Sequence, residues 1–423
     1  MRPEILRDPR RRLALGALAA LGAMALLHHW LADRRPDAAH LTARQEFIVT
    51  SSADEGPGSL REAIFAADAA LGRARIIVQV DAIVLTTPLP PLVNPAGVVL
   101  EAAKTGVAID ARAVGTGAIF DIDAANCEVT GIRVANAPNQ AFLVRADGFH
   151  LHHVVIADSD EGVHVLEGIR NVTVAHSRFE NNRIGVQLES AAAGISVREN
   201  RFSGHRDAAV WAVQANALDG AKSQSIAVSS NHFEGDRMSL VLGNIPVVIE
   251  RNEFVTAREV AVFLIGEGAI VRNNRIRGGA GIGVFADGAQ GILIEANEVD
   301  HNGALGMLVR SSRGALLQRN RFYDNGYGIA FVLNDRNSPN VAVENMLLKQ
   351  QFDGIIVIGD SPVLRRNVAM NNRAAGLRIL TFFPLTGARV NANPFLDGNT
   401  LDGNTLNEPA HGEYRVRASE PST

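Results

Sequence analysis

The sequence has a single cysteine, few aromatic residues and no large excess of either charge. Because Cys127 is the only cysteine, a framework of internal disulfides is excluded. The 41 basic and 45 acidic residues leave a net charge of −4, so charge gives no reason to expect nucleic acid as a partner. The chain also has no phosphate-binding loop and no Ser-His-Asp order, and we expect no cofactor.

The first 45 residues differ in composition from the rest of the chain. Arg7 and Arg10–Arg12 precede an apolar run that begins at Leu13 and continues, with its extension, to Ala32. A basic start and such a run are typical of export, and the extended run reaches the roughly 20 residues of a membrane-spanning helix. We predict a signal anchor over residues 1–32, in preference to a cleaved signal peptide, and a linker over residues 33–45. The rest of the chain is then expected in the periplasm, or outside the cell if the segment is cleaved.

An asparagine returns about every 22 residues in the middle of the chain. After one longer step it recurs at intervals of 21 to 25 residues, and its positions are Asn200, Asn231, Asn252, Asn274, Asn297, Asn320 and Asn345. The longer step indicates an inserted loop over Asn216–Ser223. Each asparagine at a corner is expected to point inward and to hydrogen-bond the asparagine of the next coil.

A glycine followed by a hydrophobic residue recurs in step with the asparagines, as in Ile184-Gly185-Val186. Both elements alternate with a period of two, as strands do, and a unit of this length cannot bury its apolar face without stacked neighbours. The sequence therefore predicts an all-β fold, a parallel β-helix with regular coils over residues 129–380. Residues 46–128 hold the N-terminal cap and first coils, and residues 381–423 a covering segment and tail. We expect the glycines to permit tight corners and positive backbone angles.

The stretch Ser59-Leu60-Arg61-Glu62 has the pattern of a capping box at a helix start. An apolar stripe from Leu60 to Leu71 follows, and Gly72 is expected to end the helix. A helix at this place closes the open end of the solenoid, where core and strand edge are otherwise exposed.

The segment Thr50–Ile64, with its Ser-Leu-Arg-Glu-Ala-Ile sequence, resembles the cap of bacterial right-handed parallel β-helix repeat proteins. The superfamily includes pectate lyases, polygalacturonases and alginate epimerases, so the resemblance implies this fold and a polysaccharide-related function. Asp160-Glu161-Gly162 only loosely matches the polygalacturonase motif, and the Asp-Pro-His-Asp motif of the epimerases is absent. The resemblance therefore assigns no catalytic residue.

One outward column of the glycine-bearing strands is unusually apolar. If Val186 and its equivalents point inward, the next residues point outward, and these are Gln187, Trp211, Val241, Phe263, Phe285 and Leu308, with His164 before them and Ala330 and Ile356 after. A contiguous exposed apolar stripe marks a binding surface or a covered one. The alternatives are a C-terminal segment folded over the stripe, an aromatic platform for sugar rings, and a partner surface.

Charged residues gather at the N-terminal end of the same strands. Carboxylates beside arginines and a histidine are the groups needed for proton abstraction next to a sugar carboxylate, or for acid-assisted glycosidic cleavage. The candidate catalytic residues are Asp160, Glu161, His164, Arg183 and Asp207. The candidate substrate-binding residues are Arg206, Trp211, Asp236, Arg237 and Phe263. Glu161 or His164 is the expected base, Arg183 and Arg206 the uronate-binding groups, and Asp160 or Asp207 the acid or an orienting group. The alternative is a ladder of solvated ion pairs with no chemistry.

A second cluster contains His150, His152, His153 and His176, with Glu199 in the same column as the last two. Histidines on adjacent coils could share a soft metal, but their spacing matches no known ligand motif. We assign no metal site from the sequence and regard surface histidines as the better interpretation.

The predicted function is an exported envelope protein that binds or processes an acidic extracellular polysaccharide, as a lyase, epimerase or hydrolase if it is an enzyme. The alternative is a non-catalytic scaffold that holds an envelope protein on the Trp211–Leu308 stripe. A metal-handling protein is the third interpretation. The expected partners are a polysaccharide or an envelope protein, and a membrane through the N-terminal helix.

Overall fold

The computed structural model describes residues 45–189, 192–213, 226–335, 337–384, 386–407 and 409–411. They belong to the second of two units of the chain, Arg44–Thr423. The predicted signal anchor, the linker as far as residue 44, the predicted loop Asn216–Ser223 and the tail from residue 412 lie outside the described residues. Within the described ranges, we find no helix with the length and apolar composition that crossing a membrane requires.

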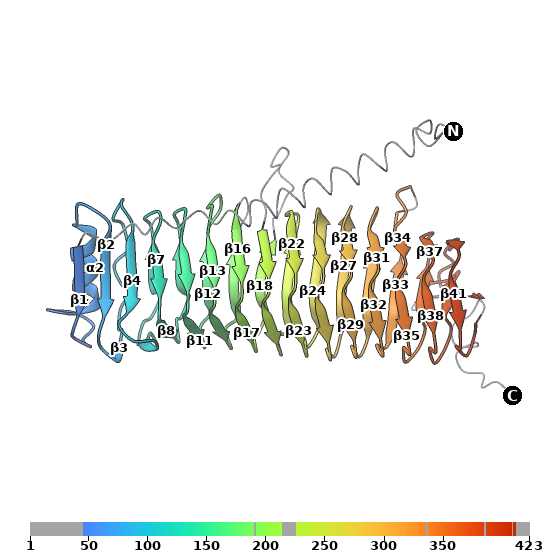
Figure 1. Cartoon of the computed structure of the whole chain (residues 1–423), viewed down its shortest axis with the longest axis horizontal. Helices are drawn as coiled ribbons and strands as arrows, with labels where there is room; N and C mark the ends of the chain where they lie inside the picture. Colours follow the sequence, from blue (N-terminus) through green and yellow to red (C-terminus); the bar gives the residue numbers. More distant parts are fainter. Residues whose placement is uncertain are drawn as a thin grey trace, which may run out of the picture. The chain divides into compact units, whose positions relative to one another are not determined.

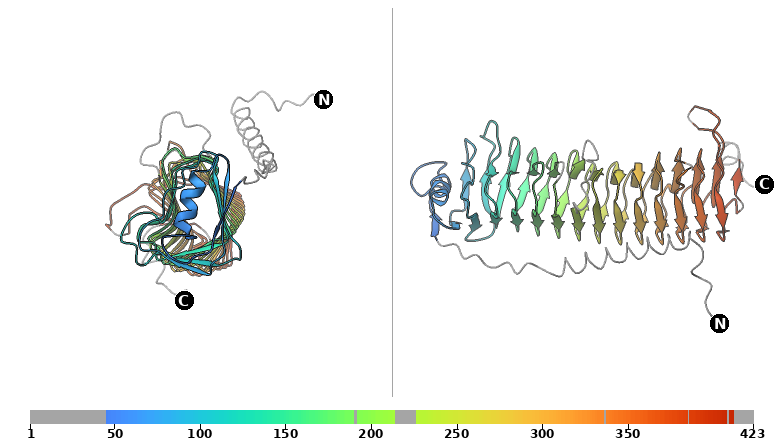
Figure 2. Two further views of the ribbon diagram at one scale, coloured as in Figure 1. Left: turned by 90° about the vertical axis from the view of Figure 1, so that its left-hand side faces the viewer. Right: turned by 90° about the horizontal axis from the view of Figure 1, so that it is seen from above.

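The coils stack on one another, and their strands form three parallel sheets (Figure 1 and Figure 2). Within the described residues, the first sheet has 15 strands: β1 (Gln45–Val49), β2 (Ala74–Val78), β4 (Val98–Ala102), β7 (Glu128–Thr130), β10 (His150–His152), β13 (Thr173–Ala175), β16 (Ile195–Arg198), β19 (Ile226–Ser229), β22 (Val247–Glu250), β25 (Ile270–Arg272), β28 (Leu293–Glu295), β31 (Leu316–Gln318), β34 (Val341–Val343), β37 (Val363–Arg365) and β40 (Phe395–Asp397).

The second sheet is built from the strand that follows in most coils. In the same ranges it has 14 strands: β3 (Ala82–Val84), β5 (Val107–Asp110), β8 (Ile132–Ala135), β11 (Val155–Ala157), β14 (Arg178–Glu180), β17 (Arg201–Ser203), β20 (His232–Glu234), β23 (Glu253–Val255), β26 (Arg275–Arg277), β29 (Glu298–Asp300), β32 (Arg321–Tyr323), β35 (Met346–Leu348), β38 (Val368–Met370) and β41 (Thr400–Asp402).

The third sheet contains the glycine-bearing strands and the predicted site. Its described strands number 13: β6 (Phe120–Ile122), β9 (Gln140–Val144), β12 (Glu161–Val165), β15 (Ile184–Leu188), β18 (Ala208–Val213), β21 (Met238–Gly243), β24 (Val260–Glu267), β27 (Ile282–Gln290), β30 (Leu305–Arg310), β33 (Tyr327–Val332), β36 (Ile355–Ile358), β39 (Leu377–Leu380) and β42 (Ala410–His411). The predicted all-β parallel solenoid is confirmed.

Helix α2 (Leu60–Asp68) packs against β1 and β2 at the first end of the stack (Figure 2). The Ser59 side chain accepts a hydrogen bond from the Glu62 N–H at 3.2 Å, as predicted. The Glu62 carboxylate accepts from the N–H of Gly58 at 2.5 Å, one residue before the expected donor. The predicted end at Gly72 is wrong, because the helix stops at Asp68 and Leu71 is fully exposed, outside the apolar stripe.

The predicted asparagine ladder is confirmed inside the stack. The N–H of Asn200 donates to Asn231 Oδ1 at 2.9 Å, and the Asn200 side-chain amide donates to the same oxygen at 3.1 Å. The contact recurs from Asn231 onward, and its further members are Asn252, Asn274, Asn297, Asn320, Asn345, Asn367 and Asn399. These amides satisfy backbone groups that the corners leave without a partner in their own coil.

A second ladder, which the sequence analysis did not identify, runs along another corner. It includes Asn302 and Asn325, in which the Asn302 N–H donates to Asn325 Oδ1 at 3.0 Å, and it continues through Gln350 and Asn372. In the earlier coils the same column holds Asn182, which accepts from the Ser159 N–H at 3.0 Å. Two polar ladders therefore fix the stacking of neighbouring coils.

The glycines of the third sheet are required because the neighbouring coil lies very close to them. A Cβ on Gly162 would lie 2.3 Å from the Gly185 carbonyl oxygen, and one on Gly185 would lie 2.5 Å from that of Ala209. Neither glycine has a positive φ. The expectation of positive angles is therefore wrong for this column, where glycine is needed because the next coil approaches too closely for a side chain. Positive φ occurs instead at non-glycine residues just before the asparagine ladder, such as Glu199 at 56°.

Beyond Leu380 the chain first covers part of the third sheet and then forms one more coil. Phe382, Phe383 and Val390 pack against an outer apolar cluster of the third sheet that contains Ala330, Ile356, Ile358 and Leu380. The chain then returns to the stack, where β40 and β41 extend the first and second sheets. The C-terminal region is thus both a cover and a further coil.

Candidate functional site

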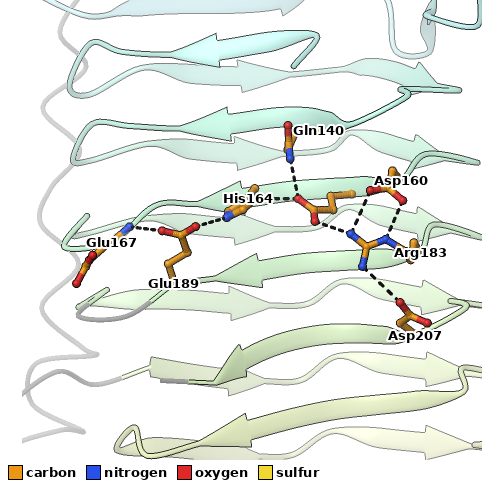
Figure 3. A network of polar contacts seen from close by, with 8 residues as sticks. Gln140, Asp160, His164, Glu167, Arg183, Glu189 and Asp207 are labelled. Atoms are coloured by element: carbon orange, nitrogen blue, oxygen red, sulfur yellow. Dashed lines mark hydrogen bonds and ion pairs between the residues drawn. The ribbon is translucent and has the colours of Figure 1, made fainter. Parts of the chain in front are cut away.

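Glu161 and His164, both from β12, belong to one polar network at the surface of the third sheet (Figure 3). Val163 and Val165 point into the core and are fully buried. Gly162 lies against the Phe179 ring, which a Cβ would approach to 3.0 Å, so the strand does not alternate regularly here. Residues three apart therefore meet on one face instead of falling on opposite faces.

The Glu161 carboxylate is the centre of this network, although it is only 6% exposed. His164 Nδ1 lies 2.8 Å from Glu161 Oε2, and Gln140 Nε2 donates to the same oxygen at 3.0 Å. On the other side of the imidazole, His164 Nε2 lies 2.9 Å from Glu189 Oε1. Because both ring nitrogens face carboxylates, both act as donors when the ring is an imidazolium.

Arg183, on the coil after Glu161, joins three carboxylates (Figure 3). Its Nη2 donates to Glu161 Oε1 at 2.6 Å, and its Nε donates to Asp160 Oδ1 at 2.7 Å. Its Nη1 reaches Asp207 Oδ2 at 3.3 Å. All three nitrogens of the guanidinium are thus engaged by the protein's own acids. Arg183 therefore holds these carboxylates near one another, and its role as a uronate-binding group stays a prediction.

Pairing shifts the pKa values of these groups away from their usual range. Burial alone raises the pKa of Glu161, but hydrogen bonds from His164 and Gln140 outweigh it and the pKa lies below the usual 4.5. Burial alone lowers the pKa of His164, but contacts with Glu161 and Glu189 outweigh it and the pKa lies above the usual 6.5. The hydrogen bonds with Asp160 raise the pKa of Arg183. The site therefore stabilises an anionic Glu161 beside a cationic His164.

The other charged candidates are not all in one place. Arg237 continues the network, since its Nη1 lies 3.7 Å from Asp207 Oδ1 and its Nε donates to Glu259 at 2.8 Å. Arg206 is exposed, and in the described part of the chain we find no ion pair for it. Asp236 is fully buried and accepts from His205 Nδ1 at 2.7 Å, so it lies in the second ladder and does not reach the surface.

Trp211 and Phe263 stand in the predicted outward column. Trp211 pairs with Gln187 on one side and Val241 on the other, and Phe263 follows Val241. The Phe263 and Phe285 rings are 5.0 Å apart. The column as predicted, from His164 to Ile356, is confirmed by the strand register.

Within the described residues, the C-terminal cover contacts the far end of this column. Ala330 and Ile356 are buried at 3% and 7% exposure in the cluster that Phe382 and Phe383 cover. Trp211 and Phe263 are half-buried. Near β33 and β36 the C-terminal segment therefore folds over the stripe, as one of the alternatives expected. The aromatic part of the stripe nearer β12 keeps an accessible surface.

A hollow of about 470 Å³ adjoins the network on the earlier coils. Its wall includes Asp121 and Leu143, which lie in the same outward column as His164, together with Gln140. Because Gln140 also donates to Glu161, the wall of the hollow is directly joined to the network. One surface of the third sheet thus runs from the hollow past His164 to Trp211.

Three members of the network, Gln140, Glu189 and Glu259, were not among the predicted site residues. Gln140 pairs with Glu161 in the register of β9 and β12, so extending the column one coil earlier would have identified it. Glu189 directly follows β15, at the end of a described range, and its position depends on where that strand ends. Sequence spacing gave no signal for it.

The arrangement contains the groups for proton transfer. A carboxylate held at hydrogen-bond distance from an imidazole is the pairing used in general acid–base catalysis. The network has five carboxylates, namely Asp160, Glu161, Glu189, Asp207 and Glu259, against the cations Arg183, Arg237 and protonated His164. This excess of negative charge disfavours a polyuronate directly over Glu161.

The stacked coils and their three parallel sheets define a parallel β-helix protein, and the acid–base network lies on one of its outer surfaces. The family model described as "Right handed beta helix region" matches residues 115–269, 221–372 and 260–408. The chain belongs to this family. Comparison with curated proteins gives no match.

Two solved structures resemble the chain in fold. The A-module of the mannuronan C-5 epimerase AlgE6 from Azotobacter vinelandii is 12% identical with a TM-score of 0.52, over 85% of this chain and 99% of that one. The catalytic unit of a GH87 α-1,3-glucanase from Streptomyces thermodiastaticus is 14% identical with a TM-score of 0.57, over 84% of this chain and 68% of that one. At these identities the likeness concerns the fold.

Proposed function

We propose that the third sheet binds a polysaccharide along its outer face and that the Glu161–His164 pair processes it. The observation that carries the proposal is the nearly buried Glu161 carboxylate, which contacts both His164 and Arg183 at the edge of the hollow. His164, Gln187 and Trp211 occupy three successive strands of one outward column. An extended chain of sugar rings can therefore contact the acid–base pair and the aromatic side chains at the same time.

The chemical roles follow from the charges. In the paired state Glu161 is the acceptor of a proton and His164 the donor, while Arg183 helps to keep Glu161 ionised. Fold relatives that act on polysaccharides, a mannuronan epimerase and an α-1,3-glucanase, support this substrate class by analogy. The excess of carboxylates favours a neutral glucan over the acidic polymer that the sequence suggested. For a polyuronate, the exposed Arg206 is the available contact.

The test is a panel of neutral and acidic polymers, including α-1,3-glucan and alginate, incubated with the full-length protein. New reducing ends, unsaturated ends and a changed C5 configuration are measured, together with retention on each polymer. We expect Glu161→Gln to abolish turnover while retention is kept. Arg277→Ala on the second sheet, which breaks an Arg277–Glu253 pair of 2.6 Å, is the matched control and should change neither.

The rival function is a scaffold that holds an envelope protein on the aromatic part of the stripe. A double variant Trp211→Ser, Phe263→Ser separates the two. Loss of polymer retention in this variant supports the polysaccharide surface. If wild-type protein shows neither turnover nor retention on any polymer, the proposal fails and the scaffold function is the better account.

A further inference from the structure

A separate polar cluster lies on the outer face of the first sheet, on β7 and β10. Glu128 and His150 are opposite one another in the register of these strands, and His152 follows two residues after His150. Leu151 and Val129 between them are fully buried, so the three polar side chains share the outer face. The third-sheet network takes no part in this cluster.

The side chains converge closely enough to share one ion. One ligand atom from each of Glu128, His150 and His152 lies within 4.8 Å of the other two. His152 Nε2 lies 3.1 Å from Glu128 Oε1, and the His150 and His152 rings are 4.4 Å apart. Two ligands at zinc distances of 2.0–2.1 Å in a tetrahedral site are about 3.3 Å apart, so the Nε2–Oε1 separation already fits a bridging metal.

The surroundings orient His152 for such a role. Its Nδ1 lies 3.2 Å from Thr130 Oγ1 and 2.8 Å from His153 Nδ1, which leaves Nε2 directed at Glu128. Partners at the second ring nitrogen fix the tautomer and the ring orientation of metal-binding histidines.

We propose that Glu128, His150 and His152 form a site for a divalent transition-metal ion such as zinc. Two imidazoles and one carboxylate are a ligand set that zinc prefers, and the partial exposure of all three leaves a fourth position open. Arg73 Nη2, 3.6 Å from Glu128 Oε2, contacts the carboxylate oxygen that does not face His152. The sequence pointed to the histidines and to Glu199. Stacking places Glu128 beside His150 instead, and this carboxylate completes the set.

The experiment measures zinc binding by the full-length protein after chelator treatment and dialysis. Titration calorimetry with zinc chloride gives affinity and stoichiometry, and metal analysis after dialysis gives bound zinc per chain. We expect one zinc per chain in the wild type. Glu128→Gln and His152→Asn should each weaken binding at least tenfold, and cobalt loading should give a visible absorption spectrum that both variants lose.

His301→Ala is the matched control, because His301 is an exposed histidine beside Asp300 with a 2.7 Å contact. It should bind zinc as the wild type does. Circular dichroism shows whether each variant is folded. If His152→Asn does not fold, Glu128→Gln still tests the site, because glutamine has nearly the same size as glutamate. The proposal is overturned if the wild type binds no zinc at millimolar zinc chloride, or if folded Glu128→Gln binds it unchanged.

Discussion

Arg183 and Glu161 lie on neighbouring coils, and the Arg183 Nη2 atom is 2.6 Å from Glu161 Oε1. This contact joins the nearly buried carboxylate of β12 to a guanidinium that two further acids also engage. Because the partners are 22 positions apart in the sequence, one per coil, the network depends on the stacking of coils and not on any local motif.

Replacing Arg183 with alanine leaves three carboxylates near one another without their common cation. Their mutual repulsion raises the pKa of Glu161 and weakens its preference for the ionised form. We expect turnover on the active polymer to fall about 100-fold or more, the scale of a lost acid–base group. Initial rates of wild type, Arg183→Ala and Arg277→Ala measure this. Equal rates in all three would contradict the assigned role.

The His164–Glu161 pair makes stability depend on pH at both ends of a window. The folded pKa of His164 is raised, so its contribution is complete below the usual value of 6.5 and is lost as pH rises through the folded pKa. The folded pKa of Glu161 is lowered, so its contribution is complete above 4.5 and is lost as pH falls through the folded pKa. Thermal unfolding of wild type and His164→Asn should differ most between pH 4.5 and 6.5. A difference that is constant with pH would show that the pair is not coupled to folding.

Asn274 is a central member of the first ladder. Its Oδ1 accepts from the Asn252 N–H at 3.0 Å, and its amide donates to the Ile249 carbonyl at 2.9 Å. Asn274→Ala leaves these buried groups without partners, and we expect the free energy of unfolding to fall by about 1–3 kcal/mol. Urea denaturation measures the change, with the exposed neighbour Arg275→Ala as the control. Equal midpoints for both variants would show that the ladder contributes little.

Asp353 and Arg378 form a buried ion pair near the C-terminal end of the third sheet. The Arg378 Nε donates to Asp353 Oδ2 at 2.9 Å, and both side chains are at most 1% exposed. Asp353→Ala removes the carboxylate that pairs with this buried guanidinium, and we expect the free energy of unfolding to fall by about 3–5 kcal/mol.

The exposed pair Arg365–Asp397, at 3.8 Å, is the comparison for this substitution. Asp397→Ala should cost less than about 1 kcal/mol because water screens both charges. Denaturant titration of the two variants gives both values. Losses of similar size would mean that burial does not control the strength of these pairs.

The outward column of the third sheet could be predicted because two simple periods determine it. Strand alternation places Trp211 and Phe263 on the same side as His164, and the coil period places them in register. Glu161, His164 and Arg183 were predicted together because they lie at the start of strands in adjacent coils. The structure joins them, although Glu161 and His164 meet only because β12 departs from regular alternation.

Asp236 shows where this reasoning fails. It was predicted as a substrate-binding residue together with Arg206, but it pairs with His205 in a buried ladder. Corners between strands vary by a residue, and an error of one residue turns a surface side chain into an interior one. The last coil was also hidden, because the ladder step from Asn367 to Asn399 is 32 residues long and breaks the visible repeat.

Each ladder contact joins residues only one coil apart, as Asn252 and Asn274 are, 22 positions from one another. A ribosome therefore needs to release only about one coil's length of chain before that coil can close its contacts with the coil already formed. The protein can be assembled in the order in which it is synthesised, without waiting for its C-terminus. Helix α2, which is made early and packs on β1 and β2, provides the surface on which this growth begins.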